Sequence, residues 1–167
     1  MTENPLWDFA LAVYARPGVP AACLDLQDRC GQDVNVLLFA AWAGLACGAR
    51  LSADELARID ATVAPWRSEV VRPLRAVRRR VKGEDQGLYD RLKSSELAAE
   101  RVQQDRLFAA SGLVPGPGGS VELAAANLRL LVPGDDPALA VLIAALWTAT
   151  AGPDAHASEA RPANEAM

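Results

Sequence analysis

Arginine and lysine side chains crowd one short stretch of the chain. Residues 66–82 read WRSEVVRPLRAVRRRVK, with six arginines, one lysine and a single glutamate. An arginine guanidinium is planar and carries several N–H donors, so it binds phosphate and carboxylate groups through paired hydrogen bonds. The adjacent cations of residues 78–80 repel one another unless an anion lies nearby. We interpret this basic stretch (residues 66–82) as a candidate surface for an anionic ligand.

On a helical wheel the basic stretch and the residues just before it separate into two faces. Six apolar side chains fall on an arc of about 80° and are predicted to pack into the fold: Val63, Trp66, Val70, Leu74, Val77 and Val81. Six cations fall on an adjoining arc of about 140° and are the predicted anion- or partner-binding residues: Arg67, Arg72, Arg75, Arg78, Arg79 and Lys82. Because proline has no amide hydrogen, Pro73 predicts either a kink at Arg72–Pro73 or a helix that restarts there.

Three anionic ligands fit such a face: an acidic partner protein, RNA or an anionic lipid surface. RNA binding commonly uses aromatic side chains that stack on bases, but Trp66 is the only aromatic residue of the stretch and is predicted to face the core. We expect a protein or RNA partner rather than a membrane. The alternative is a solvated polar face whose arginines are neutralised by neighbouring acidic helices.

A second group of polar residues lies in LDLQDRCGQDVN, residues 24–35. Two carboxylates one helical turn apart, as at Asp25 and Asp28, occur in metal-binding and acid–base sites. A polar pocket here would indicate a small enzyme or small-molecule carrier, with these residues: Asp25, Asp28, Asp33, Asn35, Trp42 and Trp66. The structural alternative is that Asp33 caps a helix while Asp25 or Asp28 pairs with Arg29 or with the basic stretch.

Other kinds of catalytic chemistry find little support. The only histidine, His156, lies near the end of the chain, which excludes histidine-dependent catalysis in the core. Three cysteines form an odd count without C-x-x-C spacing, which argues against a disulfide framework or a zinc site. The loop PGPGGS at residues 115–120 matches neither a P-loop nor a dinucleotide-binding turn. We predict no catalytic residue, no metal and no cofactor, and we favour binding over catalysis.

The composition predicts a helical protein that does not cross a membrane. Alanine and leucine dominate the 167 residues, 51% of which are hydrophobic, and the net charge is −4. The longest uncharged apolar runs, residues 36–49 and 137–152, are shorter than the roughly 20 residues that span a bilayer. The first ten residues lack the layout of a secretory signal. We therefore expect a cytoplasmic protein. Self-association through an apolar helix face is a further alternative.

Capping and helix-breaking residues divide the chain into helices. Asn4 before Pro5 marks one start, Ser52 with Glu55 forms a capping box at another, and Pro65 is expected to interrupt the helix that follows. These signals predict an all-α, single-domain bundle of about six or seven helices. The bundle would cover residues 1–152, in blocks 4–82 and 84–152, and residues 153–167 would form a disordered tail.

Two blocks of the sequence together resemble a known family. They are LWDFALAVYARPGVPAACLDLQDRCGQDVNVLLFAAWAG and APWRSEVVRPLRAVRRRVK. The resemblance covers roughly residues 6–82 and is to small proteobacterial proteins of about 160 residues whose function is unknown. It implies a bacterial, cytoplasmic, all-helical protein, and it provides no catalytic or ligand-binding residues to carry over.

Overall fold

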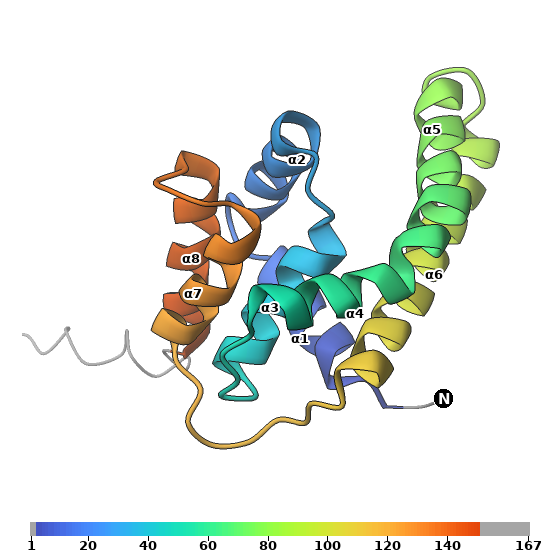
Figure 1. Ribbon diagram of the computed structural model, residues 1–167. Coiled ribbons are helices and arrows are strands. Elements are labelled where there is room, and N and C mark those ends of the chain that lie inside the picture. Colours follow the sequence, from blue (N-terminus) through green and yellow to red (C-terminus); the bar gives the residue numbers. More distant parts are fainter. Residues whose placement is uncertain (1–2, 151–167) are drawn as a thin grey trace, which may run out of the picture.

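The structure is a computed structural model that describes residues 3–150, so the tail predicted for residues 153–167 lies outside the described residues. Those residues contain no strand (Figure 1). Their elements are α1 (Pro5–Tyr14), α2 (Val19–Cys30), α3 (Val34–Leu45), α4 (Ala53–Trp66), the π-helical segment η1 (Arg67–Val71), α5 (Arg72–Val81), α6 (Gln86–Ser111), α7 (Val121–Leu131) and α8 (Pro137–Thr150). The predicted all-α, single-domain fold is confirmed.

The helix starts follow the local signals in the sequence. The Asn4 side chain accepts hydrogen bonds from the first amides of α1, and Ser52 and Glu55 form the expected capping box at α4. Asp33 caps α3 through the amide of Asn35. These side chains satisfy amides that have no partner inside the helix, which explains why the helices begin where they do.

Helix α3 lies at the centre of the body and takes part in both apolar cores. One core joins α3 to α1, α2, α7 and α8, and the other joins it to α1, α4 and α6. Helices α3 and α7 approach closely because residue 44 is glycine: a Cβ there would lie 2.4 Å from the amide nitrogen of Ala124. The nearly all-apolar sequence of α3 therefore matches its position.

Helix α4 passes through Pro65 without interruption and continues through η1 into α5, which corrects the break expected at Pro65. In η1 the amide of Arg72 donates to the carbonyl of Arg67, five residues back. This wider turn lies directly before Pro73, whose ring would collide with a carbonyl in a regular α-helix. The helix thus neither stops nor restarts at Pro73.

The π segment also corrects the helical wheel predicted for the basic stretch. A π turn holds one residue more than an α turn, so every later residue is displaced by one position, about 100° around the axis. Val71 rather than Val70 is buried, and Val77 is 48% exposed instead of packed. The side chains that meet α6 are instead those of Arg75 and Arg78.

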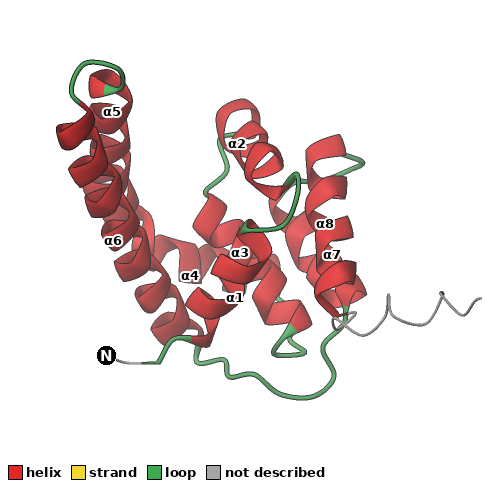
Figure 2. Ribbon diagram, turned by 180° about the vertical axis from the view of Figure 1, so that it is seen from behind, coloured by secondary structure: helices red, strands yellow, loops and turns green. Residues whose placement is uncertain are grey.

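Helix α5 and the N-terminal half of α6 lie side by side and project from the rest of the molecule (Figures 1 and 2). We call residues 72–100 the arm and the other described residues the body. Within residues 3–150 no helix is both long and apolar enough to cross a membrane.

Candidate functional site

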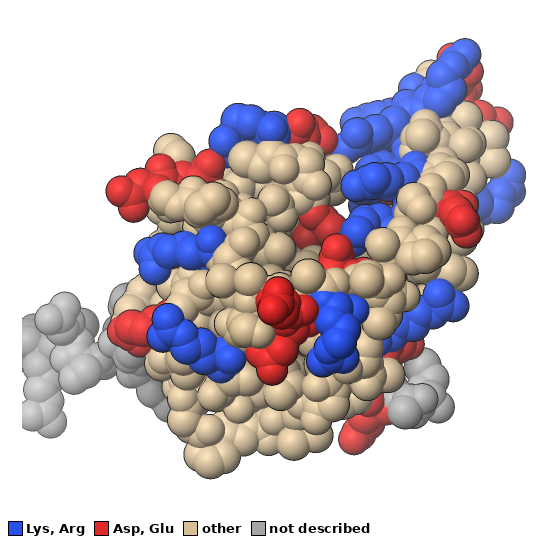
Figure 3. Space-filling view, viewed as in Figure 1, with Lys and Arg blue, Asp and Glu red and all other residues tan. Residues whose placement is uncertain are grey.

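A groove separates the arm from the body. It consists of two hollows that share Gln27, Arg75 and Arg79 in their linings. The polar hollow, of about 320 Å³, reaches Asp33, Arg67 and Arg72. The apolar hollow, of about 390 Å³, lies between α1 and α2 on one side and the arm on the other. Lysine and arginine side chains follow the edge of the arm that faces α2 (Figure 3).

Arg67 fastens the π segment to the start of α3. Its Nη1 lies 2.9 Å from Oδ2 of Asp33 and 2.7 Å from Oδ1 of Asp60. Burial opposes the charged form of Arg67, but the hydrogen bonds to the two aspartates outweigh burial and raise the pKa of the guanidinium. Because both carboxylates are engaged by Arg67, this cation holds the fold rather than an external ligand.

Arg75 and Arg78 join α5 to α6 through two glutamates. Nε of Arg75 lies 2.9 Å from Oε1 of Glu96, and its Nη2 lies 3.0 Å from Oε1 of Glu100. Arg78 donates to the other oxygen of Glu96 and lies over the ring of Tyr89. No residue of α5 is buried, so these ion pairs take the place of an apolar seam along the arm.

The two glutamates differ in the direction of their pKa shifts. Burial alone would raise the pKa of Glu96, but hydrogen bonds from Arg78 and Arg75 outweigh it and the pKa is lowered. Burial raises the pKa of Glu100 although Arg75 lies beside it. The fold therefore favours the charged form of Glu96, which accepts hydrogen bonds from both arginines. It disfavours the charged form of Glu100, which makes Glu100 the weaker partner of Arg75.

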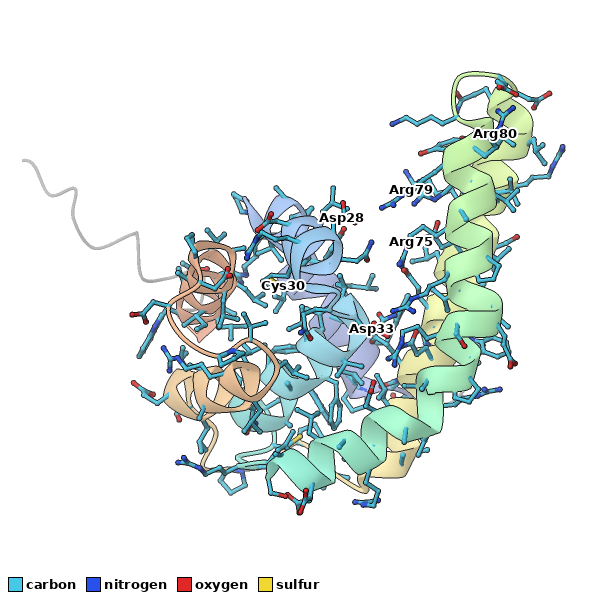
Figure 4. The ribbon with its side chains drawn as sticks, turned by 45° about the horizontal axis from the view of Figure 1, so that its top comes forward. Asp28, Cys30, Asp33, Arg75, Arg79 and Arg80 are labelled. Atoms are coloured by element: carbon cyan, nitrogen blue, oxygen red, sulfur yellow. The ribbon has the colours of Figure 1, made fainter. Side chains whose placement is uncertain are left out.

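Arg72, Arg79 and Lys82 are the three predicted cations with the weakest contacts to other side chains. Within the described residues the side chains of Arg72 and Lys82 make no ion pair. Among the described acidic residues Arg79 reaches only Asp28, with 3.9 Å between Nη2 and Oδ1, and both side chains are about half exposed. Arg75 and Arg79 extend from the arm toward α2, and Asp28 and Asp33 lie on the facing side (Figure 4). The six predicted cations thus divide into a paired inner set and an exposed outer set.

The predicted polar pocket is only partly brought together. Asp25 pairs with Arg29, which also binds Asp136 near the start of α8. Asp28 lies on the surface at the rim of the groove, and neither Asp25 nor Asp28 lines the polar or the apolar hollow. Asp33 and Asn35 do lie together, one lining the polar hollow and the other the apolar hollow.

Asp33 and Asn35 belong to a buried hydrogen-bond network that includes two glutamines of α6. Gln103 donates to Asp33 and accepts from Asn35, and Gln104 donates to the side-chain oxygen of Asn35 at 2.9 Å. Gln104 is 2% exposed, and within residues 3–150 its own oxygen, Oε1, has no hydrogen-bond partner. Because Gln104 also lines the apolar hollow, an acceptor without a donor lies beneath that part of the groove.

The two tryptophans assigned to the pocket lie elsewhere. Trp42 is in the core, with its ring 6.1 Å from that of Phe39 and 5.8 Å from that of Phe108. Trp66 donates its indole N–H to the carbonyl of Ala99 and is covered by Arg106. Neither tryptophan lines the polar or the apolar hollow, and the contacts of both are those of packed side chains.

Glu96, Glu100, Gln103 and Gln104 are the site residues that the sequence analysis missed. A signal for them exists in the sequence: they recur at helical spacing on the α6 face that continues to buried Leu107. Polar residues on the buried face of an amphipathic helix indicate an internal polar contact. Their partners, however, come from α3 and α5 and are identified only by the fold.

The remaining reactive side chains do not form a chemical centre in the described part of the chain. Burial raises the pKa of Cys23 and of Cys47 to about 11, so both remain protonated thiols at neutral pH. No group of three or more histidine, cysteine, aspartate or glutamate side chains within residues 3–150 is arranged to hold a metal ion. His156 lies outside those residues.

Comparison with known proteins places most of this chain in one family. Residues 5–107 match the model of a family described as proteins of unknown function, DUF2390. The chain therefore belongs to this family, which confirms the resemblance to a family without known function and extends it to residue 107, within the last two turns of α6. Comparisons with curated proteins and with solved structures find no match.

Proposed function

We propose that this member of the DUF2390 family is a non-enzymatic binding protein that holds an acidic protein against the groove face of its arm. One observation carries the proposal. Arg72 and Arg79 line the polar hollow, Arg72 has no ion pair within the described residues, and Arg79 has only a distant one. Two exposed guanidinium groups without close anions favour the approach of carboxylates.

Several features support a protein partner over RNA. Asp28 lies on the surface only 3.9 Å from Arg79, and its charge would repel a continuous phosphate backbone. The net charge of −4 opposes RNA in the same way. A protein surface with separate carboxylates matches the alternating charges better.

The same proposal takes the bacterial cytoplasm as the compartment. Cys23, Cys30 and Cys47 are all free thiols, which supports a reducing environment. The competing idea of a small enzyme or carrier lacks an observation of this kind. Of its carboxylates, Asp25 is paired with Arg29 and Asp33 is engaged by Arg67, so neither is free to act as a general base.

The test compares two double variants in pull-downs from bacterial lysate, each eluted by a salt gradient and analysed for protein and RNA. Arg72→Ala with Arg79→Ala removes the groove cations, and Arg91→Ala with Arg129→Ala removes two exposed cations that line neither the polar nor the apolar hollow. We expect an acidic protein that elutes at moderate salt to be lost only with the first variant.

Other outcomes would overturn the proposal. Recovery of RNA that disappears after nuclease treatment would replace the protein partner with RNA. Equal profiles for the wild type and both variants would identify Arg72 and Arg79 as ordinary solvated surface. Thermal unfolding of each variant checks that it is folded, and Arg75 and Arg78 are left unchanged because they hold the arm.

A further inference from the structure

We propose that the apolar hollow receives one amphipathic α-helix of the partner, with large apolar side chains on its buried face and carboxylates on its flank. This inference rests on the proposed function, because it specifies how the acidic partner is held. It adds a second surface to the arginines: the half-exposed apolar side chains that the arm leaves uncovered.

Four large side chains on three helices meet in this hollow. Leu11 and Tyr14 of α1, Leu24 of α2 and Leu97 of α6 line it, and each is between 43% and 50% exposed. Single exposed leucines are ordinary on a protein surface, but a cluster in one concave site marks a binding surface. Covering these side chains with another protein would remove their remaining apolar area from water.

The charges at the edge of the apolar hollow indicate which charges the partner helix carries beside its apolar face. Arg79 and Lys93 border the apolar hollow from the arm, and within residues 3–150 Lys93 makes no ion pair. The negative groups of the hollow, Glu96 and Glu100, are already engaged by Arg75 and Arg78. A helix with carboxylates beside its apolar face would neutralise the two rim cations, whereas a basic helix would be repelled.

The secondary structure of the walls favours a helix over an extended peptide. All the lining residues of the apolar hollow belong to helices, whose interior backbone groups are hydrogen-bonded within the helix. An extended peptide would find no backbone partners there and would bury unsatisfied amides. A helix satisfies its own backbone and presents side chains at spacings of three and four residues. Oε1 of Gln104 would accept from a hydroxyl or N–H group on its buried face.

The probe is a phage-displayed library of random peptides of about 16 residues, roughly 24 Å as a helix, selected against the full chain. We expect enriched peptides to carry large apolar residues at helical spacing together with aspartate or glutamate. The best peptide is then synthesised with a fluorophore, and its Kd is measured by anisotropy. A version with a central proline and a version with lysine for each acidic residue should each bind at least about tenfold more weakly.

Matched variants locate the bound peptide. Leu24→Ser with Leu97→Ser changes the floor of the apolar hollow, and Val77→Ser with Leu130→Ser changes two equally exposed side chains outside it. The first pair should raise Kd at least about tenfold, and the second should leave Kd unchanged. All four side chains are exposed, so thermal unfolding should show little change in stability for either variant.

The inference and the proposed function fail in different ways. If acidic peptides bind and lose affinity with Arg72→Ala and Arg79→Ala but not with Leu24→Ser and Leu97→Ser, the arginine face stands and the helix site is overturned. If no enriched peptide is acidic and apolar at helical spacing, the helix site is also overturned. A dimer in solution that dissociates with Leu24→Ser and Leu97→Ser would assign the hollow to a second copy of this chain.

Discussion

At the scale of single residues, Glu96 links the two helices of the arm. Its side chain is 8% exposed and its two oxygens receive Arg75 and Arg78, which are themselves 19% exposed. Removing one member of such a group leaves the others charged and poorly solvated, which costs more than the ion pairs contribute. The packing of α5 against α6 therefore depends on Glu96.

The first prediction concerns the charge of Glu96. Glu96→Gln keeps the shape of the side chain but leaves Arg75 and Arg78 with only Glu100 between them. We expect the free energy of unfolding at pH 7 to fall by about 2 kcal/mol, less than for a fully buried pair because water reaches the arginines. Urea unfolding measures the change. Glu84→Gln, at the exposed pair Arg80–Glu84, is the control and should have no measurable effect.

The difference in the free energy of unfolding between the wild type and Glu96→Gln should depend on pH, and this dependence checks the role of the carboxylate. The folded protein lowers the pKa of Glu96 below its usual 4.5. A lowered pKa contributes stability above the unfolded value, and this contribution is lost as pH falls through the folded value. The gap in stability between the wild type and Glu96→Gln should therefore narrow below about pH 4.5. A gap that stays constant down to pH 3 would contradict this role of the carboxylate.

How far the sequence predicted individual residues depends on the distance to their partners. The cap at Asp33 and the pairing of Asp25 with Arg29 are local; the sequence offered the cap directly and the pair as one of several alternatives for Asp25 and Asp28. Arg75 with Glu96 joins residues that are 21 positions apart, and their encounter depends on how α5 is rotated against α6. The types of the side chains alone do not predict how α5 is rotated against α6.

At the scale of elements, the π-helical segment η1 sets the rotation of α5 against α6. The extra residue of the π turn moves Val77 out of the α6 interface and brings Arg78 into it. A regular helix through the same sequence would place valines between α5 and α6 and would direct Arg75 and Arg78 to solvent. The starts of the helices were predictable from caps, whereas the register beyond Val71 was not, because a π turn has no strong local signature.

The second prediction changes this register. Inserting one alanine between Ser68 and Glu69 displaces α5 by one more position, about 100°, and should separate Arg75 and Arg78 from Glu96. The effect of Glu96→Gln on the free energy of unfolding should then largely disappear in the inserted chain. Urea unfolding of the insertion with and without Glu96→Gln measures this coupling.

A deletion provides the matched comparison. Removing Ser68 together with Pro73→Ala allows a regular α-helix that keeps the present faces of α5, since the π turn contains one surplus residue and the proline no longer needs it. In that chain Glu96→Gln should remain as costly as in the wild type. If the insertion and the deletion behave alike, η1 does not set the rotation of the arm.

At the scale of the whole molecule, α7 and α8 complete the core although the family match ends before them, at residue 107. Both helices cover apolar side chains of α2 and α3. The side chain of Asn127 also accepts from the amide of Leu51 and donates to the carbonyls of Ala40 and Ala49. The body that supports the groove therefore depends on residues beyond the matched region.

The third prediction is that a chain ending at Gly112 does not form this body. Truncation there removes six large aliphatic side chains that are at most 4% exposed: Val121, Leu128, Val132, Leu139, Leu142 and Leu146. Each contributes about 1.5–3 kcal/mol when buried, and their sum approaches or exceeds the 5–15 kcal/mol that typically separates folded from unfolded states. The truncated chain should unfold without cooperativity in circular dichroism and should bind a hydrophobic dye.

A chain ending at Gly152 is the control and should unfold like the full protein. Cooperative unfolding of the shorter chain near the midpoint of the full protein would instead mean that residues 1–112 fold independently and that α7 and α8 are an accessory layer.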